Sequence, residues 1–275
     1  MNSESEIAIR NQPGVPAIRS VNWGGLQALY LKEVRRFFKV QLQTIWAPAL
    51  TTLLYLVIFT VALGRVKREV LGVSFPDFLA PGLIIMGMMQ NAFANSSFSL
   101  LVGKIQGTIV DYLMPPLSTA EVLFGLAGAA ATRAVLVGFA IWGAMMFWPD
   151  VHVMPRHLWA VALFGLLGSF MLAFMGVLTS IWAEKFDHAA AVTNFVVAPL
   201  ALLSGTFYSV DKLAPTFAAI SHANPFHYAI SGFRYGFIGQ ADIPLGFGVA
   251  LLLGINIALA ALCYSLLKTG WKIKS

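Results

Sequence analysis

The sequence predicts an all-α integral membrane protein with six transmembrane helices, preceded by an amphipathic interfacial helix. Of the 275 residues, 58% are hydrophobic and only 11% are charged, whereas an ordinary soluble domain carries about 25% charged residues. The mean hydropathy is +0.76. A helix needs about 20 mainly apolar residues to cross the hydrocarbon core, and the chain has six such runs, at roughly 44–64, 77–100, 119–147, 158–182, 189–209 and 244–267. Together they place one six-span domain at 44–267.

Short polar tails flank this domain. Residues 1–20, which include Pro13, Gly14 and Pro16, are expected to form a mobile cytoplasmic tail. Residues 268–275 are expected to form a second one. The first 40 residues lack a short apolar stretch followed by a small-residue cleavage site, so we expect no cleavable signal peptide and regard the first span as the insertion signal.

Residues 21–43 form the clearest amphipathic stretch. At 100° per residue the basic side chains share one sector and the apolar ones lie opposite, as in a helix on a membrane surface. Its role is open between a lipid anchor and a protein-docking element. The basic side chains are Lys32, Arg35, Arg36 and Lys39, and the apolar ones are Trp23, Tyr30, Val34 and Phe37.

The positions of lysine and arginine predict the orientation, because cytoplasmic flanks carry the excess. With the N-terminus inside, 11 of these residues fall on the cytoplasmic side and 6 outside, while Arg133 lies within the third span. Both termini are therefore expected in the cytoplasm, although Arg65, Lys67 and Arg68 form an outer basic cluster. The pI of 9.6 reflects these flanking charges and does not indicate nucleic-acid binding.

The joint between spans two and three, residues 101–118, is unusual. Pro115 and Pro116 stop helix propagation, and Ser118 with Glu121 has the spacing of a capping box. Upstream, "GKIQGTIVDYL" allows a short helix with Ile105, Ile109 and Tyr112 on one side. We therefore expect a short rigid element, which structural economy alone could also explain.

Two stretches, "KIQGTIVDYLMPPLSTAEVLFG" and "LLSGTFYSVDKLAPTFAAISHANPFHYAISGFRYGFIG", together with the six spans, resemble the membrane subunits of type-2 ABC exporters. The resemblance implies that the joint is a coupling helix for a separate ATPase and that short re-entrant outer helices, at 210–240, precede the last span. It also implies two ATPase copies carrying ATP and Mg²⁺, and a second copy of this chain. The implied coupling residues are Lys104, Ile105, Ile109, Asp111, Tyr112, Pro115, Pro116, Ser118 and Glu121, and the implied outer motif is Asn224, Pro225 and Arg234.

No site for catalysis, metal or nucleotide is expected in this chain. It contains no Gly-x-x-x-x-Gly-Lys followed by Ser or Thr, so ATP hydrolysis must belong to another polypeptide. The histidine pairs 152/157 and 222/227 lack a third ligand nearby, and Cys263 is the single cysteine. We therefore expect no bound cofactor.

Polar residues within spans two and five are candidates for the transport path. Asn91 and Asn95 are four residues apart and so share a helix face, and polar groups in hydrocarbon need partners. Pro81 and Pro199 interrupt the same two spans, which can mark a transport site or simply kink the helices for packing. The resemblance adds that these spans border the central dimer interface. The candidates are Gln90, Asn91, Asn95, Thr193, Asn194 and Pro199.

Two classes of function remain at this level. One is the permease subunit of an ATP-driven exporter in the bacterial inner membrane, and the other is an ATP-independent carrier or an integral membrane enzyme. A proton-coupled carrier would place acids inside its spans, but the twelve acids lie at span ends and in loops. The resemblance implies an amphipathic drug, a lipid-linked compound or a saccharide as substrate, and leaves open which one, and whether the partner copy is identical.

Overall fold

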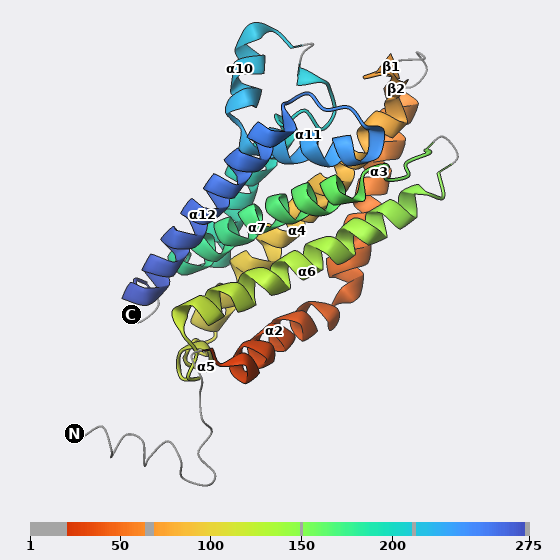
Figure 1. Ribbon diagram of the computed structural model, residues 1–275. Helices are drawn as coiled ribbons and strands as arrows, with labels where there is room; N and C mark the ends of the chain where they lie inside the picture. Colours follow the sequence, from red (N-terminus) through yellow and green to blue (C-terminus); the bar gives the residue numbers. More distant parts are fainter. Residues whose placement is uncertain (1–20, 64–68, 149–150, 211–212, 273–275) are drawn as a thin grey trace, which may run out of the picture.

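The computed structural model describes residues 21–63, 69–148, 151–210 and 213–272 as a bundle of long helices with short elements at both ends (Figure 1). The predicted tail 1–20 and the outer basic cluster at 65–68 lie outside the described residues. The elements in chain order are α2 (Trp23–Phe38), the π-helix η1 (Leu42–Trp46), α3 (Ala47–Leu63), β1 (Glu69–Val70), β2 (Val73–Ser74), α4 (Phe75–Ile105), α5 (Val110–Leu113), α6 (Thr119–Met145), α7 (Leu158–Trp182), α8 (Phe186–Val192), the π-helix η2 (Thr193–Val197), α9 (Ala198–Leu202), α10 (Pro215–Ala223), α11 (Pro225–Ile238) and α12 (Leu245–Thr269).

Helix α4 is the centre of the bundle. It contacts α3, α6, α7 and α11, and its buried residues lie on every side of the helix. A helix of this kind has no free polar face, which explains why its amide and hydroxyl side chains must find partners inside the protein. With 31 residues it is about 46 Å long at 1.5 Å per residue.

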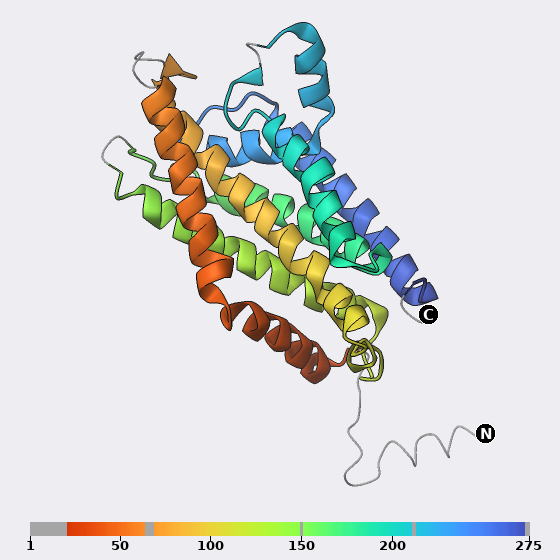
Figure 2. The same cartoon turned by 180° about the vertical axis from the view of Figure 1, so that it is seen from behind.

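Helix α2 lies against α6 and meets α3 at an angle (Figures 1 and 2). Thr44, in η1 at the bend, donates its hydroxyl to the carbonyl of Phe37 at 2.9 Å. Gly125 allows the close approach of the two helices, because a Cβ there would lie 2.9 Å from Leu29. Phe37, on the expected apolar face of this helix, does not lie at a membrane surface, since it is 2% exposed and packs in the protein core.

Four helices are long and apolar enough to cross a membrane, within the described part of the chain: Leu42–Val61, Thr119–Met145, Leu158–Trp182 and Leu245–Thr269. They coincide with the expected spans one, three, four and six. The second expected span lies in α4, whose composition is more polar because protein surrounds it.

The fifth expected span, 189–209, is shorter as a helix than its apolar run. Its apolar helix is Phe186–Leu202, about 25 Å long at 1.5 Å per residue. The chain then leaves the helix at Leu203, and Gly205 has a φ of +82°, in the region that favours glycine. The apolar residues that follow belong to a turn.

The two ends of the bundle differ. One end carries the hairpin β1–β2, α10 and α11, and the opposite end carries α5 and the end of α12 (Figure 1). At the α5 end, Lys272 pairs with Glu184 at 2.8 Å, and Lys104 donates to the carbonyl of Ile181 at 2.8 Å. These contacts hold the ends of α4, α7 and α12 together.

Candidate functional site

The joint between α4 and α6 is built from two turns and a short helix. Helix α4 ends at Ile105, and Gly107 turns the chain with a φ of +72°. Helix α5 follows as Val110–Leu113 and stops before Pro115. The short helix is therefore limited to α5, and the three residues expected on one side of it are separated: Tyr112 is buried, whereas Ile105 is exposed on the last turn of α4.

The capping box at the start of α6 is confirmed. The amide of Glu121 donates to the Ser118 hydroxyl at 3.3 Å, and the amide of Ser118 donates to Glu121 Oε2 at 2.6 Å. Because two free amides of the first turn gain acceptors, α6 begins at a fixed residue.

The same carboxylate also holds the start of α2. Glu121 Oε1 accepts from the amide of Asn22 at 2.6 Å, and the Asn22 side chain donates to the carbonyl of Pro116 at 3.1 Å. Asn22 is itself the N-cap of α2, accepting from the amide of Gly25 at 3.0 Å. One glutamate thus joins the beginnings of two helices to the proline turn.

A second carboxylate, Glu33 of α2, connects α2 to α4 and α5. Glu33 is fully buried. It accepts from the Tyr112 hydroxyl at 2.8 Å, from the Ser99 hydroxyl at 2.9 Å and from Arg36 at 2.8 Å. Arg36 also donates to the carbonyl of Asn95 at 2.8 Å. A buried charge with an ion pair and two hydrogen bonds meets the condition under which burial is tolerated.

Tyr112 is held from both sides. Lys32 places its ammonium 3.6 Å from the centre of the Tyr112 ring, a cation–π contact. Burial raises the pKa of Tyr112 above its usual value, and the neighbouring Glu33 raises it further. The hydroxyl therefore stays protonated and remains the donor to the carboxylate.

The tip of the joint carries exposed apolar side chains. They are Ile105, Val110, Leu113 and Met114, the last 79% exposed. Ile109 is partly buried against the core, while Lys104 points to α7. Asp111, Pro115, Pro116 and Ser118 are exposed. An exposed apolar group beside a rigid turn has the composition of a protein-binding surface.

Two of the candidate path residues of α4, Asn91 and Asn95, are buried against arginines of neighbouring helices. Asn91 accepts from Arg133 of α6 at 2.8 Å, and Asn95 faces Arg36 of α2. Gln90 is partly buried. Arg133, within α6, thus donates to a side-chain amide, and the polar face of α4 points at protein.

The candidate path residues after α8 lie elsewhere. Thr193 and Asn194 of η2 and Pro199 of α9 are exposed, next to Phe195, which is also exposed. The π-helix stands directly before Ala198–Pro199, so the proline begins a new α-helical segment. Figure 2 shows this segment on the face behind the one that Figure 1 presents.

At the other end of the bundle, side chains from residues 221 to 234 donate hydrogen bonds to the last carbonyls of α9 and to those of the turn that follows it. Asn224 is the N-cap of α11 and donates to the carbonyl of Leu200 at 2.6 Å. Pro225 is the first residue of α11, where a missing amide proton does no harm. Two further side-chain contacts to this turn are Ser221 to the carbonyl of Leu203 at 2.9 Å and His227 to the carbonyl of Ser204 at 3.1 Å.

Arg234 completes this arrangement. It is 1% exposed, donates to the carbonyl of Gly205 at 2.8 Å and lies 3.4 Å from Asp242. Its guanidinium is 3.9 Å from the ring centre of Phe78 in α4. The predicted outer motif is therefore one contact layer that fixes the end of α9.

Several residues that hold these sites were not selected from the sequence: Asn22, Glu33, Ser99, Ser221, His227 and Asp242. A signal existed for Glu33, because it is the single acid in a basic amphipathic helix and stands three residues before Arg36. The contacts to Ser99 and Tyr112 span 66 and 79 residues. No local pattern could have shown them.

The way the bundle is held together defines the class of protein. Buried amides, hydroxyls and charges bridge otherwise apolar helices, as in membrane proteins with several spans. The model of the ABC-2 type transporter family matches residues 25–238. The chain belongs to this family and is a type-2 ABC permease.

Individual relatives cover nearly the whole chain. It is 35% identical over 254 residues to the inner membrane transport permease YadH of Escherichia coli K12, covering 92% of this chain and 98% of YadH. It is 28% identical over 234 residues to nodulation protein J of Rhizobium leguminosarum bv. viciae, covering 82% and 88%. Nodulation protein J of Neorhizobium galegae is 26% identical over 204 residues, covering 69% and 73%.

Proposed function

We propose that the chain forms the membrane path of an ATP-driven exporter in the bacterial inner membrane, with six spans and both termini in the cytoplasm. Two identical copies bind two copies of a separate ATPase, which hold ATP and Mg²⁺. The substrate is an amphipathic drug, a lipid-linked compound or a saccharide. The resemblance to type-2 exporters supports export as the direction, and the location agrees with that of YadH, which is named an inner membrane transport permease.

The observation that carries the proposal is the attachment of the joint to α2 by two carboxylates. Glu121 links the proline turn to the start of α2, and Glu33 links α5 to α2 and α4. A displacement applied at α5 therefore reaches three helices through hydrogen bonds of 2.6 to 3.1 Å. A flexible loop would absorb such a displacement.

The proposed topology agrees with the contacts at the α5 end. Lys272, just after α12, pairs with Glu184, in the connection between α7 and α8. The joint, this connection and the C-terminal residues thus share one side. With α2 at the membrane surface on that side, its exposed Arg35 and Lys39 would meet the head groups of the cytoplasmic leaflet.

The proposed dimer is supported by the exposed face of η2 and α9. Asn194 is exposed in a segment at membrane depth, and an amide there needs a partner or water. A second copy with a water-lined path between the two would supply both. In the proposed path, Thr193, Asn194 and Pro199 form one wall. Gln90, Asn91 and Asn95 line it from α4 when the contacts of the two asparagines open.

Docking of the ATPase is tested at the exposed tip. Met114→Asp puts a charge into the apolar surface without touching the carboxylate contacts, so the permease should fold but lose its ATPase during purification of the co-expressed pair. Met154→Asp is the matched control, because Met154 is also exposed, at 59%, but lies in the connection between α6 and α7 at the opposite end. Retention of the ATPase by the Met114 variant would refute docking at the joint.

A further inference from the structure

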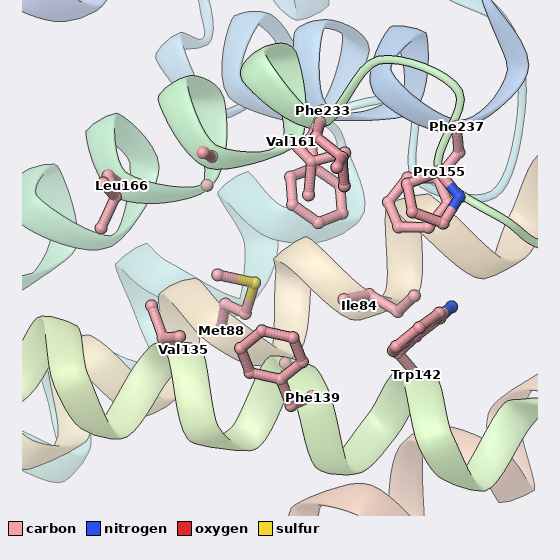
Figure 3. A pocket seen from close by; sticks show the side chains of 14 residues that line it. Ile84, Met88, Val135, Phe139, Trp142, Pro155, Val161, Leu166, Phe233 and Phe237 are labelled. Carbon is pink, nitrogen blue, oxygen red and sulfur yellow. The ribbon is translucent and has the colours of Figure 1, made fainter.

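An apolar pocket of about 450 Å³ opens between α6 and α7. Ile84 and Met88 of α4 form its back, Phe139 and Trp142 of α6 one wall, and Phe233 of α11 part of the other (Figure 3). Its volume falls within the range of about 300–1,000 Å³ that is typical of small-molecule sites.

The pocket exists because α7 presents small residues at this level. Ala162 and Gly165 line it, where a large residue would fill the space. Phe139, 63% exposed, forms the lip on α6, and the exposed Leu158 and Leu166 form the lip on α7. The pocket is therefore enclosed by helices on three sides and open to the surroundings of the bundle on the fourth.

The residues that line the pocket have no free side-chain group that could form a hydrogen bond with water. Its polar side-chain group is the Trp142 indole, whose N–H already donates to the carbonyl of Val153 at 2.9 Å. A buried water needs two to four polar partners, and an empty pocket forfeits dispersion contacts along its walls. At membrane depth, the abundant apolar molecule that can enter from the open side is a lipid chain.

The mouth carries residue types that are typical of the level at which a bilayer becomes polar. Pro155 lines the pocket, and the next residue, Arg156, is exposed with its guanidinium 3.4 Å from the carbonyl of Ile238. Trp159, exposed beside Tyr235, is the kind of residue that gathers at membrane–water interfaces. An arginine at this level can bind a phosphate through two parallel hydrogen bonds.

We propose that this pocket binds an acyl chain of one membrane phospholipid, with the lipid phosphate at Arg156. The pocket lies apart from the path wall formed by Thr193, Asn194 and Pro199, because it is lined by α6 and α7, which lie at the front of Figure 1, whereas η2 and α9 lie at the front of Figure 2. Lipid binding can be measured without substrate or ATP, so its failure and the failure of the proposed function are distinguishable.

The first test counts retained lipid by native mass spectrometry of the full chain, purified with its ATPase in mild detergent. The wild type is expected to keep one phospholipid per permease chain, and Ala162→Trp, which fills the pocket, to lose it. Ala258→Trp is the control, since Ala258 is an exposed alanine of α12 outside the pocket. Equal retention in the two variants would overturn the proposal, as would a wild type without bound lipid.

The second test needs no variant. A phospholipid with a diazirine near the end of one acyl chain is added to the complex in nanodiscs and cross-linked by light. Peptides that contain Phe139 and Leu166 are expected to carry the label, and those with Ile257, exposed on α12, to carry much less. Even labelling would overturn the proposal. So would labelling of the pocket by an apolar probe without a head group but not by the phospholipid.

Discussion

Replacement of Glu33 by leucine should loosen α2 and α5 together. The change removes the acceptor of the buried Tyr112 hydroxyl and the ion-pair partner of Arg36. Ser99 keeps a second acceptor, the carbonyl of Asn95 at 3.0 Å, and Arg36 is partly exposed and keeps that carbonyl too. Tyr112 is therefore the group that loses its partner.

The size of the effect follows from these contacts. A buried polar group without a partner costs about 1–3 kcal/mol, and the loss of the ion pair adds to it, so we expect about 3 kcal/mol. Since 1.4 kcal/mol corresponds to a factor of ten, local opening of α2 and α5 should become about 100-fold more frequent. Glu33→Gln, which keeps an acceptor, should have a smaller effect.

Hydrogen–deuterium exchange of the permease–ATPase complex measures this opening directly. Amides of Trp23–Phe38 and Val110–Leu113 should exchange faster in Glu33→Leu, while those of α7 should not change. Glu184→Leu serves as the control, because Glu184 also pairs with a cation at this end of the bundle but is exposed. If exchange in α2 and α5 is the same in Glu33→Leu as in the wild type, the carboxylate does not hold the joint.

Three further variants probe the joint, the polar face and the outer layer. Pro115→Gly with Pro116→Gly restores backbone freedom; we expect normal ATPase binding but less transport per ATP in proteoliposomes, and an unchanged ratio would leave the joint a mere turn. Asn91→Leu with Asn95→Leu also removes the acceptor of Arg133, so it is compared with Arg133→Leu, which breaks the same contact but keeps both asparagines; export should be lower in the asparagine variant, and equal export in the two would leave only a packing role. Arg234→Met leaves a buried carboxylate without its cation, so thermal stability in detergent should fall, by about 3 kcal/mol. An unchanged melting temperature would refute that assignment.

The sequence predicted the structure correctly where residues close together in the chain determine it. The capping box at Ser118 and Glu121 formed because its groups are three residues apart, and the apolar runs gave the long helices because hydrocarbon demands them. The fifth run, by contrast, is an apolar helix only to Leu202. Its end is set by contacts with α10 and α11, which apolar composition does not encode.

The sequence predicted which residues form the candidate sites better than it predicted which residues they contact. The structure brings Asn224 and Arg234 together at the end of α9, but Asp242, which pairs with Arg234, was not foreseen. Asn91 was recognised as needing a partner, and the structure supplies Arg133. The burial of Glu33 depended on α5 folding back beside α2, a long-range arrangement that helical periodicity does not specify.

The contacts around the end of α9 restrict how the molecule can deform. Side chains of α10, of α11 and of Asn224 between them are bonded to the carbonyls of Leu200, Leu203, Ser204, Gly205 and Thr206, so these elements must travel as one rigid body. Asp242 pairs with Arg234 and so belongs to this body, which leaves bending to residues 183–185 before α8 and to residues 243–244 before α12. A movement that opens this end is expected to be a swing about these two hinges.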